Sequence, residues 1–201
     1  MIYPYVICEP APPPDCRGLG RARLRALEHD RLAAVYSRHR SLRPRPSPEA
    51  LLAHDRVVEA AMARGPVLPL RFGTVLADES RLADELRARR AEFLRGLELV
   101  RGRVEIGLRA VAKRTGASTG RAYVEGLLQA RRAGRDLHAP LAELAVASRL
   151  RERGAGPLTA SYLVDRVEAT SFRARAEELA AARDELSVVV TGPWPPYSFA
   201  E

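Results

Sequence analysis

Residues 103–113 read RVEIGLRAVAK, and this stretch indicates the fold of the second half of the chain. Apolar side chains recur at every second position, at Val104, Ile106, Leu108 and Ala110. A period of two is typical of a strand that buries one face and leaves the other open. We therefore predict a strand over these residues, with its apolar face against a core.

The residues that follow this strand indicate helices and further strands. We predict a helix, a second helix after a break near Gly134, a strand, a third helix and a last strand, over residues 121–133, 140–153, 158–167, 170–183 and 186–191. This order fits helices on one face of a mainly antiparallel sheet. The second half is therefore expected to be an α+β sandwich of the ferredoxin-like kind.

The first half of the chain also mixes strands and helices. Strands are predicted over residues 2–8, 21–28, 31–37 and 67–72, and helices over residues 48–64 and 80–100. Ser47 is suited to cap the first helix and Pro48 to begin it. We expect that helix to bury Leu51, Leu52, Val58 and Met62. The second helix carries a clear helical seam, formed by Leu82, Leu86, Phe93 and Leu97.

The predicted elements divide the chain into two small α+β domains. Gly102 marks the expected joint, so the domains comprise residues 1–101 and residues 102–191. Residues 192–201 form a C-terminal tail that is dense in proline and aromatic residues. Proline lacks the backbone N–H that a helix or a central strand needs, so neither element is expected to continue there.

Composition sets limits on the class of protein. The chain has 201 residues, of which 46% are hydrophobic and 29% charged, so it can bury a sizeable core. No apolar run approaches the roughly 18 residues of a membrane helix, and the apolar start lacks a basic leader. We expect a cytoplasmic protein. Cys8 and Cys16 are expected to be reduced thiols, and no pair of ligands has metal spacing, so we expect no metal and no cofactor.

The net charge of +8 raises the alternative of a basic α+β protein that binds nucleic acid. Acids stand close to many arginines on the predicted helices, as Asp84 does to Arg87 and Glu177 to Arg173. Such mixing is typical of a solvated helix face. A surface that stacks nucleic-acid bases alternates aromatic and basic residues, and the aromatic residues of this chain do not follow that pattern. We therefore expect no specific binding of nucleic acid.

The sequence carries no motif of a known catalytic site. Gly18 and Gly20 form a G-x-G, but a predicted strand follows them, whereas a dinucleotide fingerprint requires a helix there. No G-x-S-x-G occurs. His54 shares its predicted helix with Glu59, five residues away, which is a poor spacing for a shared site. We expect His54 to be a partly buried residue bonded to a neighbouring loop, and we expect no enzyme and no small-molecule substrate.

Two segments are unusual enough to suggest contacts with a partner. Residues 66–75 read PVLPLRFGTV and place Arg71 beside Phe72 in an apolar setting. A buried guanidinium needs a carboxylate or several carbonyls, so we expect Arg71 to be buried and paired; a partner contact is the alternative. Residues 191–199 read TGPWPPYSF. Their prolines hold the backbone extended and lower the entropy lost on docking.

The two segments together resemble the two signatures of the gas vesicle protein F/L family. Weaker matches occur in the same order along the chain, at residues 32–37, around His54, at residues 104–105 and at residues 162–164. The resemblance extends from about Tyr3 to Phe199. The terminal signature is the more specific, since nine such residues in a row rarely match by chance.

The resemblance implies a fold, a role and a set of partners. It implies two α+β domains, the second a modified ferredoxin-like one, in a minor structural component or assembly factor of the gas vesicle, a hollow protein shell that provides buoyancy. The implied partners are the small hydrophobic shell protein, gas vesicle protein A, and other minor vesicle proteins. It implies no catalytic residue.

Five residues of the two segments are our candidates for structural or partner contacts: Arg71, Phe72, Trp194, Tyr197 and Phe199. We expect residues 193–199 to pack back on the body of the protein with Trp194 as the anchor. Exposed aromatic side chains on such a tail are costly unless something covers them. The alternative is a free hook that inserts into the shell protein.

Overall fold

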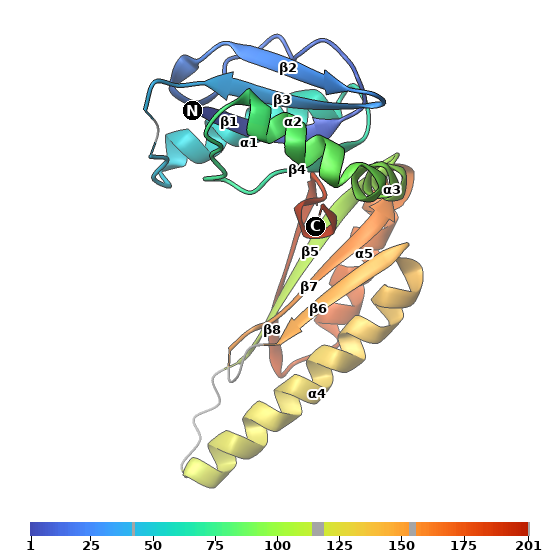
Figure 1. Cartoon of the computed structure of the whole chain (residues 1–201). Helices are drawn as coiled ribbons and strands as arrows, with labels where there is room; N and C mark the ends of the chain where they lie inside the picture. The colour runs from blue at the N-terminus through green and yellow to red at the C-terminus, as the bar shows by residue number, and fades with distance from the viewer. Residues whose placement is uncertain (42, 114–118, 153–155, 201) are drawn as a thin grey trace. The chain divides into compact units, whose positions relative to one another are not determined.

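The structure, a computed structural model, describes residues 1–41, 43–113, 119–152 and 156–200. The chain divides into two compact units (Figure 1). Unit 1 comprises Met1–Gly102 together with Pro195–Glu201, and unit 2 comprises Arg103–Trp194. The last residues of the chain therefore belong to the same unit as the first.

Unit 1 is built on a four-stranded antiparallel sheet with the order β2-β3-β1-β4. The strands are β1 Ile2–Cys8, β2 Leu24–His29, β3 Leu32–Arg38 and β4 Val67–Pro69. The predicted strand over residues 67–72 was too long. Leu70 still donates its N–H to the Tyr5 carbonyl at 2.8 Å, but a turn closed by the Thr74 N–H on the Arg71 carbonyl ends the extended run.

Three α-helices cover this sheet: α1 Pro48–Met62, α2 Glu79–Ala88 and α3 Arg90–Val100. Successive residues of a strand point to opposite faces. In β3, Val35 belongs to the apolar cluster that contains α1, whereas Tyr36 donates to Glu79 at the start of α2. Helix α1 thus covers one face and α2 the other. Residues 32–37 of β3 are accordingly all buried.

Two predictions about these helices were wrong in part. Leu51 and Leu52 are 45% and 63% exposed, because α1 faces the sheet with the four residues His54, Val57, Val58 and Ala61. This stripe follows the i, i+3, i+4, i+7 spacing of a single helix face. The helix predicted over residues 80–100 breaks at Arg89, whose φ of −105° and ψ of 19° are not helical. Its predicted apolar seam, from Leu82 to Leu97, is nevertheless buried.

Unit 2 has the order of elements β-α-β-β-α-β. They are β5 Arg103–Ala112, α4 Gly120–Leu144, β6 Ala147–Glu152, β7 Leu158–Asp165, α5 Ala169–Ala181 and β8 Leu186–Trp194. The antiparallel sheet has the order β6-β7-β5-β8, with both central strands buried on the face that carries α4 and α5. This is the expected ferredoxin-like arrangement.

The prediction of two helices over residues 121–133 and 140–153 was wrong. A single helix, α4, continues past Gly134 and includes Pro140, and the following residues form the edge strand β6. Gly134 does not end the helix but lets it approach β7, since a Cβ there would lie 2.9 Å from Leu158 Cδ1. The long yellow helix of Figure 1 is α4.

The ends of α5 and β8 also differ from prediction. Helix α5 begins after Glu168, with no side-chain cap, and neither Thr170 nor Ser171 caps it. Strand β8 continues to Trp194, so the first three residues of the predicted tail extend the sheet. No helix among the described residues is long and apolar enough to cross a membrane.

Candidate functional site

The conspicuous side-chain cluster of unit 1 surrounds His54, on the buried face of α1. We call it the His54 cluster; its members are Tyr3, Tyr5, His54, Phe72 and Tyr197. The four aromatic rings have centroids 5.5 to 6.3 Å from the imidazole, and they come from β1, the loop after β4 and the C-terminal 3-10 turn Tyr197–Phe199. Segments from both ends of the chain therefore meet at one histidine.

The hydrogen bonds of the cluster define the proton position on His54. The Tyr3 hydroxyl accepts from the Gly73 N–H at 3.1 Å and lies 2.9 Å from His54 Nδ1. We infer that Tyr3 donates to Nδ1, which puts the imidazole proton on Nε2. Nε2 is buried and forms no hydrogen bond with any described residue.

Burial decides the protonation state of this cluster. It lowers the pKa of His54, and the weaker effects of the Leu70 carbonyl and of Asp55 oppose that shift without reversing it. Burial likewise raises the pKa of Tyr3 to about 12. At neutral pH the cluster is therefore uncharged. Because Nδ1 is bonded to a tyrosine, His54 lacks the carboxylate partner that orients a general base.

A second polar chain runs beside this cluster through Tyr5. Its hydroxyl accepts from the Leu19 N–H at 2.7 Å and lies 2.9 Å from Ser37 Oγ. Ser37 Oγ in turn lies 2.8 Å from His39 Nε2. Tyr5 is fully buried, so these bonds satisfy a hydroxyl that would otherwise be costly to bury.

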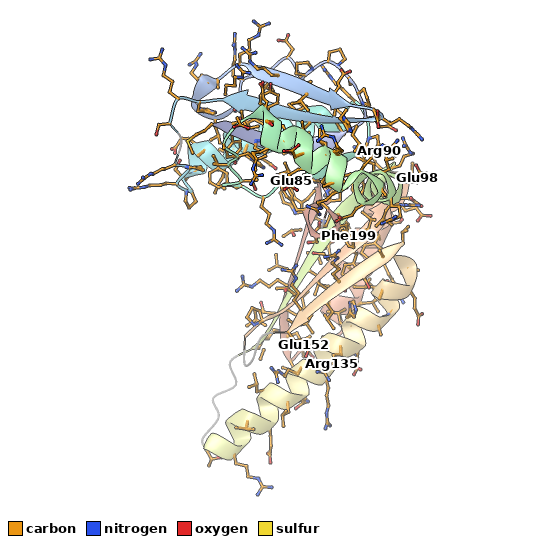
Figure 2. The ribbon with its side chains drawn as sticks, in the orientation of Figure 1. Glu85, Arg90, Glu98, Arg135, Glu152 and Phe199 are labelled. Atoms are coloured by element: carbon orange, nitrogen blue, oxygen red, sulfur yellow. The ribbon has the colours of Figure 1, made fainter. Side chains whose placement is uncertain are left out.

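Of the candidate residues in the tail, Tyr197 and Phe199 are covered and Trp194 is not. Tyr197 packs against the apolar cluster of α1 and β1, and its ring lies 6.3 Å from His54. Phe199, labelled in Figure 2, is 4% exposed. Trp194 is 46% exposed and belongs to β8, where it pairs with Glu105. Our expectation that Trp194 anchors the tail is wrong, because it precedes the part of the tail that lies on unit 1.

The two candidates near β4 also differ in position. Phe72 is half-buried, and its ring contacts Tyr3 and His54. Arg71 is exposed, which contradicts our expectation of a buried arginine. The strand has ended at this point: the Arg71 carbonyl accepts from the Thr74 N–H and from Thr74 Oγ1 in a surface turn, which leaves the Arg71 side chain exposed.

The charged residues are arranged as local pairs of opposite sign. Arg173 bonds Glu177 and Arg87 bonds Asp84 along their own helices. Arg135 of α4 donates to both carboxylate oxygens of Glu152 of β6, from Nε at 2.8 Å and from Nη2 at 2.7 Å, and Figure 2 labels this pair. Among the described residues, no group of three or more His, Cys, Asp or Glu side chains could hold a metal ion.

A comparison with models of protein families shows which family the chain belongs to. The family model described as gas vesicle synthesis protein GvpL/GvpF matches residues 1–123 and 118–201. The chain belongs to this family. The two matched ranges together span both units.

Relatives within the GvpL/GvpF family carry both F and L names. Gas vesicle protein L of Streptomyces sp. (strain CB03234) is 30% identical over 246 residues, which cover 98% of this chain and 92% of that protein. Gas vesicle protein F2 of Halobacterium salinarum is 29% identical over 187 residues, which cover 90% of this chain and 82% of that protein. A role connected with gas vesicles follows from this membership.

Two solved structures share the fold. The gas vesicle protein GvpF from Anabaena sp. PCC7120 superposes with a TM-score of 0.82 at 21% identity, covering 100% of this chain and 95% of that one. GvpF from Microcystis aeruginosa gives 0.77 at 18% identity, covering 100% and 98%. The α+β fold in two sheets is thus the fold of GvpF proteins.

Sequence reasoning missed the partners of His54. Tyr3 lies 51 positions before it, and Tyr197 lies 143 positions after it, by the difference of their numbers. No local pattern connects residues so far apart. The one available signal was the pair of alternating tyrosines in residues 2–8, since polar hydroxyls on a buried strand require partners.

Proposed function

We propose that this GvpL/GvpF protein is a minor structural component or assembly factor of gas vesicles that binds the hydrophobic shell protein, gas vesicle protein A, and other minor vesicle proteins. The observation that carries the proposal is the family match, which spans both units. We further propose that the protein acts without catalysis and works at the gas vesicle inside the cytoplasm. It requires no cofactor and no nucleic acid.

Physical reasoning supports this role. A shell protein that faces gas must be strongly apolar, and such a surface aggregates before assembly unless a partner covers it. A chain with 29% charged residues and a few exposed apolar side chains suits that task. Aromatic residues and arginine are also the residues enriched at contacts between proteins.

The exposed candidates are the ones that we propose as shell contacts. Arg71 is exposed on unit 1, and Trp194 is 46% exposed on unit 2. Phe72, Tyr197 and Phe199 are turned to the interior and have the structural role instead. An exposed tryptophan is costly in water, and a partner that covers it recovers that free energy.

The test is co-purification with tagged gas vesicle protein A from a vesicle-forming host. We expect Trp194→Ala and Arg71→Ala each to reduce recovery of the shell protein at least about threefold, since hot-spot side chains at such contacts contribute about 1 kcal/mol or more. Val167→Ala and Arg21→Ala are matched controls, because both side chains are exposed.

All four variants should melt like the wild type. Recovery that is lost in the controls as well, or retained in both test variants, would reject these two contacts. A wild-type chain that recovers no shell protein and no other vesicle protein would reject the proposed role itself.

A further inference from the structure

The outer edge of the unit 2 sheet is long and uncharged. Strand β8 reads LSVVVTGPW and pairs on one side with β5. Given the order β6-β7-β5-β8, its other side is a sheet edge. Natural proteins usually protect such an edge with charges, proline, a bulge or a short strand, and in β8 the proline and the register shift are confined to the end near Trp194. Strand β8 has nine residues and no charged one.

The hydrogen bonds around β8 define which backbone groups point outward. The Lys113 N–H donates to the Glu185 carbonyl at 2.9 Å, so that pair is one of the bonded pairs of the antiparallel ladder. Bonded pairs alternate along such a ladder. Residues 187, 189 and 191 therefore bond to β5, while residues 186, 188 and 190 turn their N–H and C=O groups away from it.

At each end of this outer edge, one backbone group is already bonded from the α5 side. The Leu186 N–H donates to the Arg183 carbonyl at 3.1 Å, and the Gly192 carbonyl accepts from Arg173 at 2.9 Å. Between them, Val188 and Val190 each present an N–H and a C=O for which the described part of the chain provides no partner. These two valines thus offer four backbone groups to an added strand.

A groove runs along this same edge. It has a volume of about 530 Å³ and is lined on one side by residues 186–190 of β8 and on the other by Glu177, Ala180 and Ala181 of α5; Lys113, Arg183 and Asp184 complete the lining and place charges of both signs around it. Its volume lies within the usual range for binding pockets, about 300–1,000 Å³. The small alanine side chains leave room beside the strand. Val188 and Val190 are half-buried and form the apolar wall.

We propose that this groove binds an extended, uncharged segment of another polypeptide, which adds to the sheet as a fifth strand beside β8. Backbone hydrogen bonds to Val188 and Val190 would hold the segment, and every second side chain would lie against Ala180 and Ala181. This is the strand-addition mode of peptide recognition, in which a helix forms the second wall. Binding of a strand at β8 does not depend on which vesicle protein is the partner under the proposed function.

A single strand fits this groove better than a second copy of the chain. Symmetric pairing of two β8 edges would bring the α5 of each copy alongside the groove of the other. The groove has a helix wall at Ala180 and Ala181 already, and the space beside it suits an isolated strand. Self-pairing through β8 is therefore the competing outcome of the test.

The probe is a fluorescent, capped peptide of alternating threonine and valine with one lysine at each end. We expect saturable binding to the full chain, and slower amide hydrogen exchange at Val188 and Val190 when the peptide is bound. A peptide of the same composition with alternate backbone nitrogens methylated is the control, since it cannot donate the hydrogen bonds. We expect it to bind at least about tenfold more weakly.

The matched variants are Val190→Pro and Val189→Pro. Proline at position 190 removes an outward N–H and should weaken peptide binding at least about tenfold while unit 2 stays folded, as proline is tolerated at sheet edges. Proline at position 189 removes an N–H that bonds to β5 and should unfold the edge strand. If Val190→Pro also unfolds, Ala181→Trp, which fills the groove, replaces it, with the exposed Ala174→Trp as control.

Equal binding of both peptides, full binding by the variant with a filled or blocked groove, or no binding to the wild type would each overturn the proposal. Protection of Val188 and Val190 that rises with protein concentration, together with a dimer in sedimentation, would show self-pairing instead and would likewise overturn it.

Discussion

Gly18 lies where a buried tyrosine leaves no room for a side chain. A Cβ at this position would be 2.1 Å from the Tyr5 hydroxyl oxygen and 2.8 Å from Cζ. That hydroxyl is held by Leu19 and Ser37, so it cannot move without breaking hydrogen bonds in the core. The glycine is thus required by the close approach of the chain to Tyr5.

We expect Gly18→Ala to destabilise the protein by about 1–3 kcal/mol, the typical cost of overpacking a core. Urea unfolding followed by circular dichroism measures it. Gly65→Ala is the matched control, because no atom lies within 4 Å of a Cβ there. A Gly18→Ala variant as stable as the control would show that the Tyr5 hydroxyl can relocate freely.

His54 makes the stability of unit 1 depend on pH. Burial lowers its pKa below the ordinary value of about 6.5, so the unfolded chain takes up a proton at a higher pH than the folded one does. Stability is therefore complete above about pH 6.5 and falls as the pH drops from there towards the folded pKa.

We expect His54→Gln to flatten this fall below about pH 6.5, while an amide oxygen can still accept from Tyr3. Part of the slope should remain, because burial also lowers the pKa of His39 and of His138. Thermal melts at several pH values measure the effect. An unchanged slope in the variant would mean that His54 does not titrate as its burial requires.

At the scale of elements, the C-terminal 3-10 turn Tyr197–Phe199 packs on unit 1 and is expected to stabilise it. Tyr197 packs against the core of α1 and β1, whereas Trp194 remains 46% exposed. The three preceding prolines restrict the unfolded chain and so reduce the entropy lost when the turn docks. Docking of the C-terminal turn is therefore expected to depend on Tyr197 and not on Trp194.

Tyr197→Ala should cost on the order of 2 kcal/mol, less than a fully buried aromatic residue because the ring is only partly covered. Trp194→Ala should cost less than about 1 kcal/mol. Chemical denaturation compares the two. The emission of Trp194 in the folded wild type should also lie near that of the unfolded chain; a strong blue shift, or a larger loss for Trp194→Ala, would contradict this account.

At the scale of the whole molecule, unit 2 is inserted between two parts of unit 1. The chain leaves unit 1 after Gly102 and returns at Pro195. Glu105 and Trp194 are partners in the ladder between β5 and β8, so the outgoing and returning chains lie side by side. A short linker can therefore replace unit 2 without stretching either end.

We expect residues 1–102 joined through a short glycine-serine linker to residues 195–201 to fold, and to be more stable than residues 1–102 alone. The gain should be on the order of 2 kcal/mol, since it restores the contacts of Tyr197. Urea titrations of the two fragments give the comparison. Equal stability of the fragments would show that the C-terminal segment does not belong energetically to unit 1.

The sequence by itself determined the α+β class, most strands and the cap of the first helix. Alternation in residues 103–113 and the spacing of Leu82, Leu86 and Phe93 are local signals, because a strand or a helix repeats over a few residues. Ser47 caps α1 as predicted, because its own side chain acts on the next turn. The two signature segments, residues 66–75 and 191–199, likewise identified the family.

Tertiary structure alone decided the continuity of α4, the position of Arg71 and the location of the tail. Gly134 and Pro140 are local signals that end a helix, but packing of Gly134 against Leu158 outweighs them. Which residues of the tail are buried, and which residues contact His54, depends on residues far apart in the chain. Such contacts form only when the sheet is assembled, so no pattern of neighbouring residues records them.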